Sequence, residues 1–558
     1  LIKNENIDGY VVPKNDEFFS EYSYPNRLKS ISNFSGSAGL AIILKDKNLL
    51  FVDGRYTLQA YIECGKNFKI FEIPKIRPFE VIKKIKNRLT LGFDPKLFTE
   101  TSLRANFRGL CNLVPINTNL IDKIFNLKKD YKTKEFYCLN ANISGESVSS
   151  KLNRLSSMLN KKKINNIFIS APENCAWLLN IRGFDNPNSP IPNCQIILNN
   201  KQIYFFSDIE KIKKIKNSIN YKKIKFYEFS DFTKVIYQLI GNNFSIDNNS
   251  CSIFNKSIIL SKFNINNKID PCYELKAVKN NTEINNMINA HISDGAALTK
   301  FLFWIKKNFK NKAITEISAQ NKLESFRKMN KAYKFPSFST ISGAGPNSAI
   351  IHYKASVRSN RTLKKGDLYL VDSGGQYSFG TTDVTRTISL DNNSKFIMDI
   401  YTRVLKGHIA VSEYNIKKNS KGSDIDHGAR KPLKKIGLDY PHGTGHGVGY
   451  FLNVHEGPQS LSKKNNVNLK PGMIVSNEPG YYKEGFFGIR IENLVFVKKN
   501  RFEELTMTPI EKNLIIKNML NKKEIGWLNR YHARVRKNLF KFMNLEEKAN
   551  LIDACSPI

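Results

Sequence analysis

The sequence has no hydrophobic run long enough to cross a membrane. A spanning helix needs roughly 18 to 20 consecutive apolar residues with few charges, and no window of the chain offers them. Residues 1–17 carry charge from the start and lack the apolar centre of a signal peptide. These absences predict a cytoplasmic protein that does not insert into membranes.

The chain also lacks a cysteine pattern typical of a disulfide scaffold or a zinc-binding domain. Its eight cysteines are scattered, with no CxxC pair among them. Small secreted domains that depend on disulfides space their cysteines far more densely. We therefore expect reduced, buried thiols.

Acidic residues are scarce, since 49 Asp and Glu face 87 Lys and Arg, which gives a net charge of +38. Such a balance prompts a search for nucleic-acid partners. The lysines, however, stand in short groups at 161–163, 211–216 and 522–523, without an arginine-rich stripe or interleaved aromatic residues. Solvated lysine faces explain the charge better, and we predict no nucleic-acid partner.

The length of 558 residues exceeds what one hydrophobic core supports, while 41% apolar and 24% charged residues are ordinary for a globular protein. Composition changes along the chain predict an N-terminal α/β domain at 1–138, a second at 139–270, a catalytic domain at 271–502 and a C-terminal extension at 503–558.

The first two predicted domains share an alternation of strands and helices, separated by a polar segment at 128–134. In the first, strands are expected at 10–12, 40–44 and 49–52, with a helix at 56–64. In the second, helices are expected at 147–159 and 174–181, with strands at 166–170, 195–198 and 202–206. Two related domains follow.

The third domain is expected to begin with a long amphipathic helix. The Asp270-Pro271 pair interrupts regular structure before it, and Thr282 with Glu283 resembles its cap. Apolar residues then recur at helical spacing, at positions 284, 287, 288, 292, 298 and 302.

Two aspartates follow neighbouring strand-like segments of this domain. The apolar run 368–371 delivers Asp372, and Asp383 comes eleven residues later in the segment 380–387. A single aspartate after a strand is most often a turn or cap residue, so the pair alone is only suggestive.

Histidines form the next signal, HGTGHGVG at residues 442–449, followed by His455. Two histidines four residues apart are typical of a zinc-binding helix, but the intervening glycines disfavour a helix and no glutamate follows the first histidine. The same glycines do not have the GxGxxG spacing of a nucleotide-binding loop. We expect His442 and His446 on extended or looped backbone.

Glu478 and Glu492 each lie within or at the end of an apolar, strand-like run. Burying an unpaired carboxylate there is costly, and a cation is the natural compensation. Because side chains alternate along a strand, Arg490 shares a face with Glu492 and can orient that carboxylate or a bound substrate.

Together these residues predict a two-metal hydrolytic site. Four carboxylates and one imidazole favour Mn²⁺ or a related octahedral ion over structural zinc. Two such ions roughly 3.5–4 Å apart share a bridging water and lower its pKa enough to form hydroxide near neutral pH. The metal ligands are Asp372, Asp383, His446, Glu478 and Glu492.

The motifs around these residues resemble the pita-bread metallopeptidases, and within them aminopeptidase P, the Xaa-Pro aminopeptidases of the long three-domain type. The catalytic motifs are SGAGPNSAIIHY at 342–353, VDSGGQY at 371–377, GTTDVTRT at 380–387, HGTGHGVG at 442–449, VHEGP at 454–458, NEPGY at 477–481 and IRIEN at 489–493. Further similar segments are NFSGSAG at 33–39, FVDGRY at 51–56, WLLNIRG at 177–183 and EIGWLNRYHAR at 524–534.

The resemblance implies a fold class of α/β (α+β) type, with two creatinase-like N-terminal domains and a catalytic domain built on a curved, mostly antiparallel sheet. It implies hydrolysis of an N-terminal Xaa-Pro bond by a hydroxide that bridges two metal ions. Asp372 would bind one ion, His446 and Glu478 the other, and Asp383 and Glu492 would bridge both.

The resemblance also implies roles beyond metal binding. Glu478 would handle the proton of the attacking water. His352 and His455 would contact the scissile peptide as catalytic and substrate-binding residues, and His442 would line the proline pocket. Arg490 is a further substrate-binding residue. The remaining histidines, at 291, 408, 427 and 532, lie in helical patterns and are interpreted as structural or solvent-facing.

Rival functions remain open. A prolidase restricted to dipeptides shares the catalytic motifs, whereas the two N-terminal domains exceed what a methionine aminopeptidase carries. A non-catalytic pita-bread protein used for binding is supported only by the basic charge.

The resemblance implies a homodimer that uses the C-terminal region, where Trp527 and Tyr531 stand in an amphipathic segment. The alternative is a helix packed on its own domain.

Overall fold

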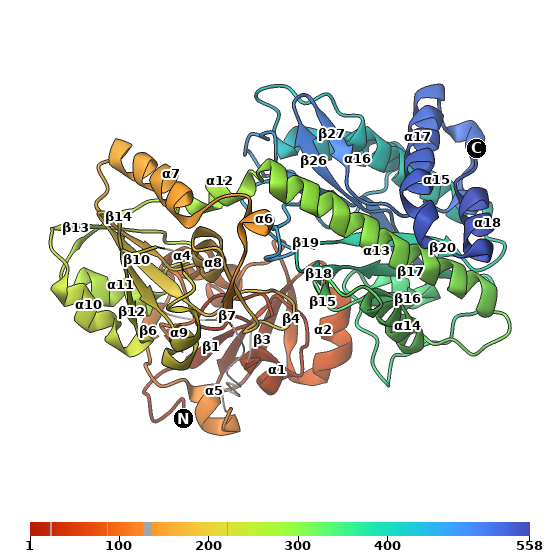
Figure 1. Cartoon of the computed structure of the whole chain (residues 1–558). Coiled ribbons are helices and arrows are strands. Elements are labelled where there is room, and N and C mark those ends of the chain that lie inside the picture. The colour runs from red at the N-terminus through yellow and green to blue at the C-terminus, as the bar shows by residue number, and fades with distance from the viewer. Residues whose placement is uncertain (23–24, 86–87, 128–135, 220) are drawn as a thin grey trace. The chain divides into compact units, whose positions relative to one another are not determined.

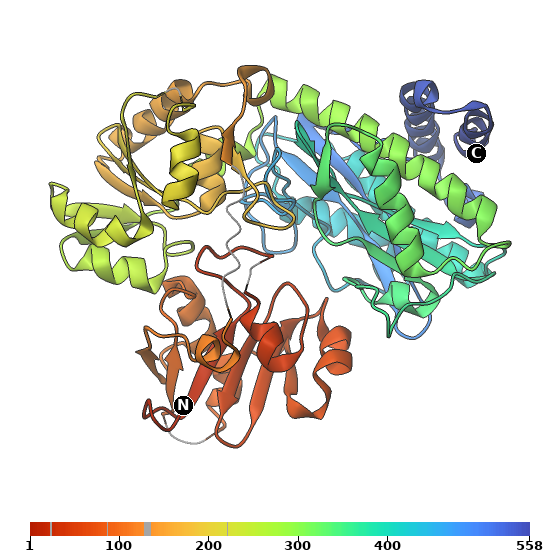
Figure 2. The ribbon, with the colours of Figure 1, turned by 60° about the horizontal axis from the view of Figure 1, so that its bottom comes forward.

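The computed structural model describes residues 1–22, 25–85, 88–127, 136–219 and 221–558, so the predicted polar segment 128–134 lies outside the described residues. The chain divides into two units, Leu1–Leu275 and Lys276–Ile558, which are described separately below. Figures 1 and 2 show the course of the chain within each unit.

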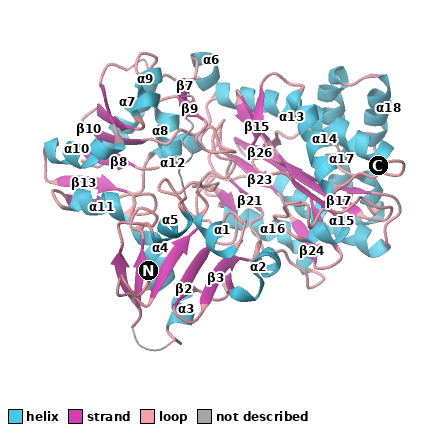
Figure 3. Ribbon diagram, turned by 90° about the horizontal axis from the view of Figure 1, so that it is seen from below, coloured by secondary structure: helices cyan, strands magenta, loops and turns pink. Residues whose placement is uncertain are grey.

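The first unit contains two six-stranded sheets, each accompanied by helices (Figure 3). One has the order β4-β3-β2-β1-β5-β6 and is formed by β1 (Gly9–Pro13), β2 (Leu40–Leu44), β3 (Asn48–Asp53), β4 (Lys69–Ile73), β5 (Thr90–Phe93) and β6 (Asn112–Pro115). The other has the order β12-β11-β10-β8-β13-β14 and is formed by β8 (Asn166–Ile169), β10 (Gln195–Asn199), β11 (Gln202–Phe206), β12 (Ile224–Tyr227), β13 (Asn243–Ile246) and β14 (Asn264–Asn267).

The helices of this unit come between the strands in sequence. They are α1 (Arg27–Ser32), α2 (Thr57–Cys64), α3 (Pro78–Ile82), α4 (Glu100–Phe107), α5 (Leu120–Phe125), α6 (Ala141–Ser144), α7 (Val148–Lys161), α8 (Pro172–Leu178), α9 (Ile209–Ile215), α10 (Phe232–Gln238) and α11 (Ile253–Leu260).

The two sheets repeat one topology. In each, the first strand pairs antiparallel with the second and parallel with the fifth, the second and third pair antiparallel, and the outer strands join in parallel. This common order confirms the prediction of two related α/β domains. A separate two-stranded ladder of β7 (Phe136–Cys138) with β9 (Ile181–Gly183) pairs residues just before and at the predicted border at 138 with residues that lie between β8 and β10 in sequence.

The second unit is built on antiparallel strands, as expected for the catalytic domain. The strands are β15 (Tyr333–Pro336), β16 (Ile341–Ala344), β17 (Leu368–Ser373), β18 (Gly375–Tyr377), β19 (Gly380–Thr381), β20 (Val384–Ser389), β21 (Gly445–His446), β22 (Ser460–Leu461), β23 (Ile474–Asn477), β24 (Gly480–Lys483), β25 (Phe487–Arg490), β26 (Asn493–Lys498) and β27 (Arg501–Glu504). The helices are α13 (Asn281–Asn308), α14 (Glu316–Lys328), α15 (Lys395–Ser412), α16 (Gly422–Lys434), α17 (Lys522–Leu539) and α18 (Leu545–Ala554), and α12 (Cys272–Ala277) spans the border of the units.

Alternation along β17 separates core side chains from the site. Tyr369 and Val371 pack with apolar residues of α13 and α14, and α13 lies across the strands in Figure 1. Leu368, Leu370 and Asp372 therefore point to the opposite face. The strand thus places a carboxylate on the face away from α13.

Two local predictions needed correction. The long helix α13 is capped by Asn280 rather than by Thr282, because Asn280 Oδ1 accepts the Glu283 N–H at 2.9 Å and Glu283 Oε2 accepts the Asn280 N–H at 3.0 Å. This reciprocal pair satisfies two free backbone donors at the helix start. The helix predicted at 174–181 ends at Leu178, and the last predicted position, Ile181, instead begins β9.

The cysteine prediction is confirmed, since all eight cysteines are free and seven of them are buried. Within the described part of the chain, no helix is both long enough and apolar enough to span a bilayer.

Candidate metal centre

The predicted ligands stand near the ends of several short ladders in the second unit. Asp372 lies in β17, Asp383 between β19 and β20, His446 at the end of β21, Glu478 directly after β23, and Glu492 between β25 and β26. The β17–β20 register pairs Asp372 with Thr385, and Asp383 stands two residues before Thr385, directly ahead of the first residue of β20.

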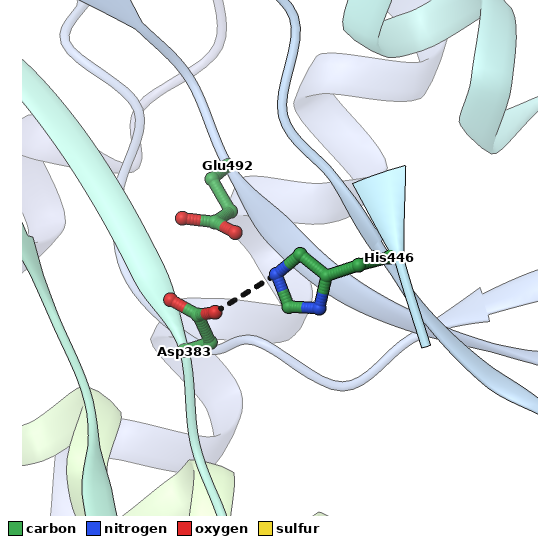
Figure 4. A group of neighbouring side chains, drawn as sticks. All are labelled: Asp383, His446 and Glu492. Atoms are coloured by element: carbon green, nitrogen blue, oxygen red, sulfur yellow. Dashed lines mark ion pairs between the residues drawn. The ribbon is translucent and has the colours of Figure 1, made fainter. Parts of the chain in front are cut away.

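Three of these side chains converge closely. Single ligand atoms of Asp383, His446 and Glu492 all lie within 4.8 Å of one another, and Figure 4 shows them pointing toward a common centre. His446 Nε2 is 3.4 Å from Asp383 Oδ2 and 3.6 Å from Glu478 Oε1. Four of the five predicted ligands, all except Asp372, therefore lie within a few ångströms of His446 or of each other.

The histidine is held on extended backbone rather than on a helix, as predicted. A Cβ atom added at Gly445 would lie 1.8 Å from Ser476 O, so only glycine lets β21 approach β23 this closely. Nδ1 of His446 lies 2.9 Å from Gly447 O, which only accepts hydrogen bonds, so Nδ1 carries a proton and Nε2 faces the carboxylates.

The cluster carries excess negative charge. Burial, together with Asp383 and Glu478, raises the pKa of Asp372 to about 7 against the opposing effect of Arg490. Burial and the neighbouring aspartates hold the pKa of Glu492 well above its ordinary value. Among the residues described at this site, four carboxylates are opposed by the Arg490 guanidinium.

The same charge acts on the imidazole. Burial disfavours the charged form of His446, but Asp383 and Glu478 outweigh it and raise its pKa to about 9. The site therefore attracts positive charge at Nε2. A metal ion in place of that proton would supply the same compensation.

An unsatisfied oxygen adds to this fit. Among the described residues, Asp372 Oδ1 is a buried polar atom without a hydrogen-bond partner, and such atoms are costly unless an ion or water meets them. Oxygen-rich ligands with one imidazole suit a hard divalent cation. The residues therefore fit the predicted metal site.

Arg490 binds a different carboxylate from the one its strand position indicated. Its guanidinium donates to Asp372 Oδ2 and, through Nε, to Thr385 Oγ1 at 3.0 Å. Thr385 Oγ1 in turn donates to Glu492 Oε2 at 2.7 Å. Arg490 thus orients Asp372 directly and Glu492 only through the threonine.

A second chain of hydrogen bonds runs from Arg490 to His442. Arg490 donates to Tyr482 Oη at 2.8 Å, and Tyr482 Oη lies 2.9 Å from His442 Nε2. His442 Nδ1 faces Gly443 O at 2.7 Å, and burial lowers its pKa to about 4. His442 is therefore neutral near pH 7, with Nε2 accepting from the tyrosine.

The two remaining predicted site histidines, His455 and His352, have different surroundings. His455 packs edge-on against the ligand His446, with ring centroids 4.3 Å apart. His352 is half-buried in the turn after the short 3-10 helix η3 (Gly345–Ala349). The helix η3 before that turn is anchored to β25, because Gly488 N donates to Ser348 Oγ at 2.7 Å.

Three further residues of this region were missed by sequence reasoning. Thr385 links Arg490 to the ligand Glu492, and Tyr482 links Arg490 to His442. Glu456 is buried between Lys276 and Lys279 directly after His455. The motifs contain Thr385 and Glu456, and Tyr482 directly follows the motif at 477–481. A threonine, tyrosine or glutamate in a strand or loop, however, has no distinctive spacing. A signal was available only for Glu456, which adjoins a predicted catalytic histidine.

The four other histidines all lie on helices, at positions 291, 408, 427 and 532, as the sequence indicated. His291, His408 and His532 are buried, and His427 is exposed.

Comparison with known proteins defines the class first. Residues 285–499 match metallopeptidase family M24, residues 1–124 and 128–283 each match the creatinase/prolidase N-terminal domain, and residues 499–558 match the C-terminal region of the M24 peptidases. The fold and the site thus define an M24 metallopeptidase with two creatinase-type domains.

Full-length relatives narrow the class. A probable Xaa-Pro aminopeptidase P of Laccaria bicolor is 35% identical over 100% of this chain and 92% of its own length, and Xaa-Pro aminopeptidase 1 of Dictyostelium discoideum is 36% identical over 99% and 93%. The chain therefore belongs to the Xaa-Pro aminopeptidase (aminopeptidase P) family, as its motifs indicated.

Solved structures agree with this placement. The X-prolyl aminopeptidase of Caenorhabditis elegans, described as a cytosolic enzyme with a di-nuclear active site, has a TM-score of 0.93 at 31% identity, over 99% of this chain and 95% of that one. The prolidase of Pyrococcus furiosus reaches a TM-score of 0.53 at 26% identity, over 63% of this chain and 99% of its own. The predicted fold class is confirmed.

Proposed function

We propose that this chain is a metal-dependent aminopeptidase that hydrolyses the bond between an N-terminal residue and a following proline. One observation carries the proposal: ligand-type side chains converge in a buried, negatively charged cluster. The cluster lies in a chain that aligns over its whole length with Xaa-Pro aminopeptidases.

The proposed metal ligands are Asp372, Asp383, His446, Glu478 and Glu492, holding two divalent ions. The di-nuclear site described for the Caenorhabditis elegans enzyme supports the number of ions. The oxygen-rich ligand set favours Mn²⁺. When bound, such ions supply a nucleophile from water at neutral pH and polarise the peptide carbonyl.

The chain's own residues would position the peptide and move protons. Glu478 is 18% exposed at its side chain, and His446 and Arg490 hold its pKa below the ordinary value despite burial. It is therefore ionised near neutral pH and can accept the proton of the attacking water. His455, which packs against His446, would stabilise charge on the carbonyl oxygen.

His352, His442 and Arg490 are proposed to bind the substrate. A bond before proline is a tertiary amide without an N–H, and its ring is rigid, so a preformed apolar pocket can select it. Burial keeps His442 neutral, and the hydrogen bond with Tyr482 orients its ring. A neutral, fixed side chain is suited to the wall of such a pocket.

Substrate length distinguishes this proposal from a prolidase. We expect the Mn²⁺-loaded enzyme to cleave an Xaa-Pro-Xaa tripeptide at least as well as an Xaa-Pro dipeptide. Activity confined to the dipeptide would favour the prolidase. A protein that cleaved neither but bound nucleic acid with a steep salt dependence would favour a non-catalytic binding role.

We further propose a cytoplasmic homodimer formed through the C-terminal region. The Caenorhabditis elegans relative is described as cytosolic. Trp527 and Tyr531 are 5% and 4% exposed within this chain, so they pack on their own unit, and the interface would use exposed residues such as Leu545 (87%). Light scattering coupled to gel filtration should give twice the mass of 63.9 kDa, and a monomer would overturn this proposal.

A further inference from the structure

Arg386 joins the metal centre to the C-terminal part of the chain. It neighbours Thr385 in β20, and because side chains alternate, Thr385 faces Glu492 while Arg386 faces the other side of the strand. Arg386 is fully buried, and its NH1 donates to Glu492 O at 2.7 Å. The backbone of a proposed ligand is therefore fixed by this guanidinium.

Helix α17 supplies a partner to the same guanidinium. Arg386 NH2 donates to Tyr531 Oη at 2.8 Å, and Tyr531 Oη donates to Thr508 O at 2.8 Å. Arg386 also donates to Thr508 O and Pro509 O. The hydroxyl thus closes a network that sets the position of the guanidinium beneath Glu492.

A separate contact from the same helix leads to the other side of the site. The Trp527 ring, stacked on Tyr531, meets the His408 ring edge-on with centroids 5.6 Å apart. His408 Nδ1 lies 3.1 Å from Asn477 O, and Asn477 Nδ2 donates to His408 O at 2.9 Å. Asn477 directly precedes Glu478, so this contact fixes the end of β23 that carries the ligand.

We infer that helix α17 is a positioning element of the metal centre, with Tyr531 acting on Glu492 through Arg386, and Trp527 acting on Glu478 through His408. This inference rests on the proposed metal site. It assigns to the C-terminal extension a role in metal affinity in addition to its packing.

The test measures metal binding directly. Wild-type protein and Tyr531→Phe are stripped with a chelator and titrated with Mn²⁺ by calorimetry. We expect the Mn²⁺ dissociation constant of Tyr531→Phe to rise about three- to tenfold, less than the roughly ten- to hundredfold typical of a residue bonded directly to a ligand side chain. Trp527→Phe, which shrinks the ring against His408, should act in the same direction.

Leu528→Ala is the matched control, because Leu528 is fully buried in the same helix and core but has no polar group. It should lower the melting temperature more than Tyr531→Phe does while leaving the Mn²⁺ dissociation constant unchanged. The inference is wrong if Tyr531→Phe binds Mn²⁺ like the wild type, or if Leu528→Ala weakens binding as much. Absence of Mn²⁺ binding in the wild type would instead overturn the proposed function.

Discussion

Replacing Glu456 by glutamine is expected to destabilise the second unit strongly. Its carboxylate lies 2.5 Å from Lys279 Nζ and 3.3 Å from Lys276 Nζ, and all three side chains are at most 2% exposed. Burial raises the pKa of Glu456, but the two lysines outweigh it and hold the pKa below its ordinary value. Without the carboxylate, two buried ammonium groups face a neutral amide.

Breaking a buried ion pair from one side costs about 3–5 kcal/mol, because the remaining charge stays buried. We expect a loss of that size in the free energy of unfolding of Glu456→Gln, measured as a shift of the urea transition followed by circular dichroism. The control is Glu413→Gln, whose partner Arg530 is 66% exposed at its side chain. It should cost less than about 1 kcal/mol.

A double variant separates charge from packing. Adding Lys279→Met to Glu456→Gln removes one of the two buried positive charges and should recover part of the lost stability. The reasoning is refuted if Glu456→Gln costs less than about 1 kcal/mol, a value typical of an exposed pair.

Three further outcomes are expected. His532 Nε2 accepts the Ile510 N–H at 3.1 Å, and burial lowers the pKa of His532 from 6.5 to about 3. Between these two pH values the imidazole binds a proton only in the unfolded chain, so the free energy of unfolding falls as pH drops below 6.5. The slope is about 1.4 kcal/mol per pH unit, and His532→Gln should remove that part of the pH dependence in unfolding titrations; an unchanged slope would contradict it. Tyr482→Phe cuts the link from Arg490 to His442 and should lower kcat/KM for a tripeptide about tenfold or more, whereas wild-type kinetics would show that the link is idle. Gly295→Ala should lower the melting temperature although alanine favours helices, since its Cβ would lie 2.0 Å from Met507 O; a rise in melting temperature would refute this packing.

The sequence predicted well those features that depend on local pattern or on whole motifs. Strand and helix alternation in the first unit, the non-helical backbone around His446 and the antiparallel second unit all follow from periodicity, glycine spacing or family resemblance. The convergence of Asp383 with Glu492 is predicted because each of these carboxylates lies in or beside a strand-like segment of the same motif set. The division into four domains and the individual residue roles stay predictions.

Contacts between distant segments could not be predicted. Arg490 shares a strand face with Glu492, so the sequence indicated Glu492 as the carboxylate that Arg490 binds. The strand register instead brings Arg490 to Asp372, 118 residues away. A sequence gives side-chain alternation within a strand but not which strands lie next to each other. The same limit concealed the support that Arg386 receives from Tyr531.

The central claim is tested most directly by the rate of Mn²⁺-dependent tripeptide cleavage in Asp383→Asn beside the wild type. Asparagine keeps the size of the side chain but removes a charge from a cluster in which like charges repel, so the variant should fold. The account predicts that the wild type cleaves an Xaa-Pro-Xaa peptide only with metal and that Asp383→Asn loses this activity. Full activity in the variant would contradict the assignment of the metal centre.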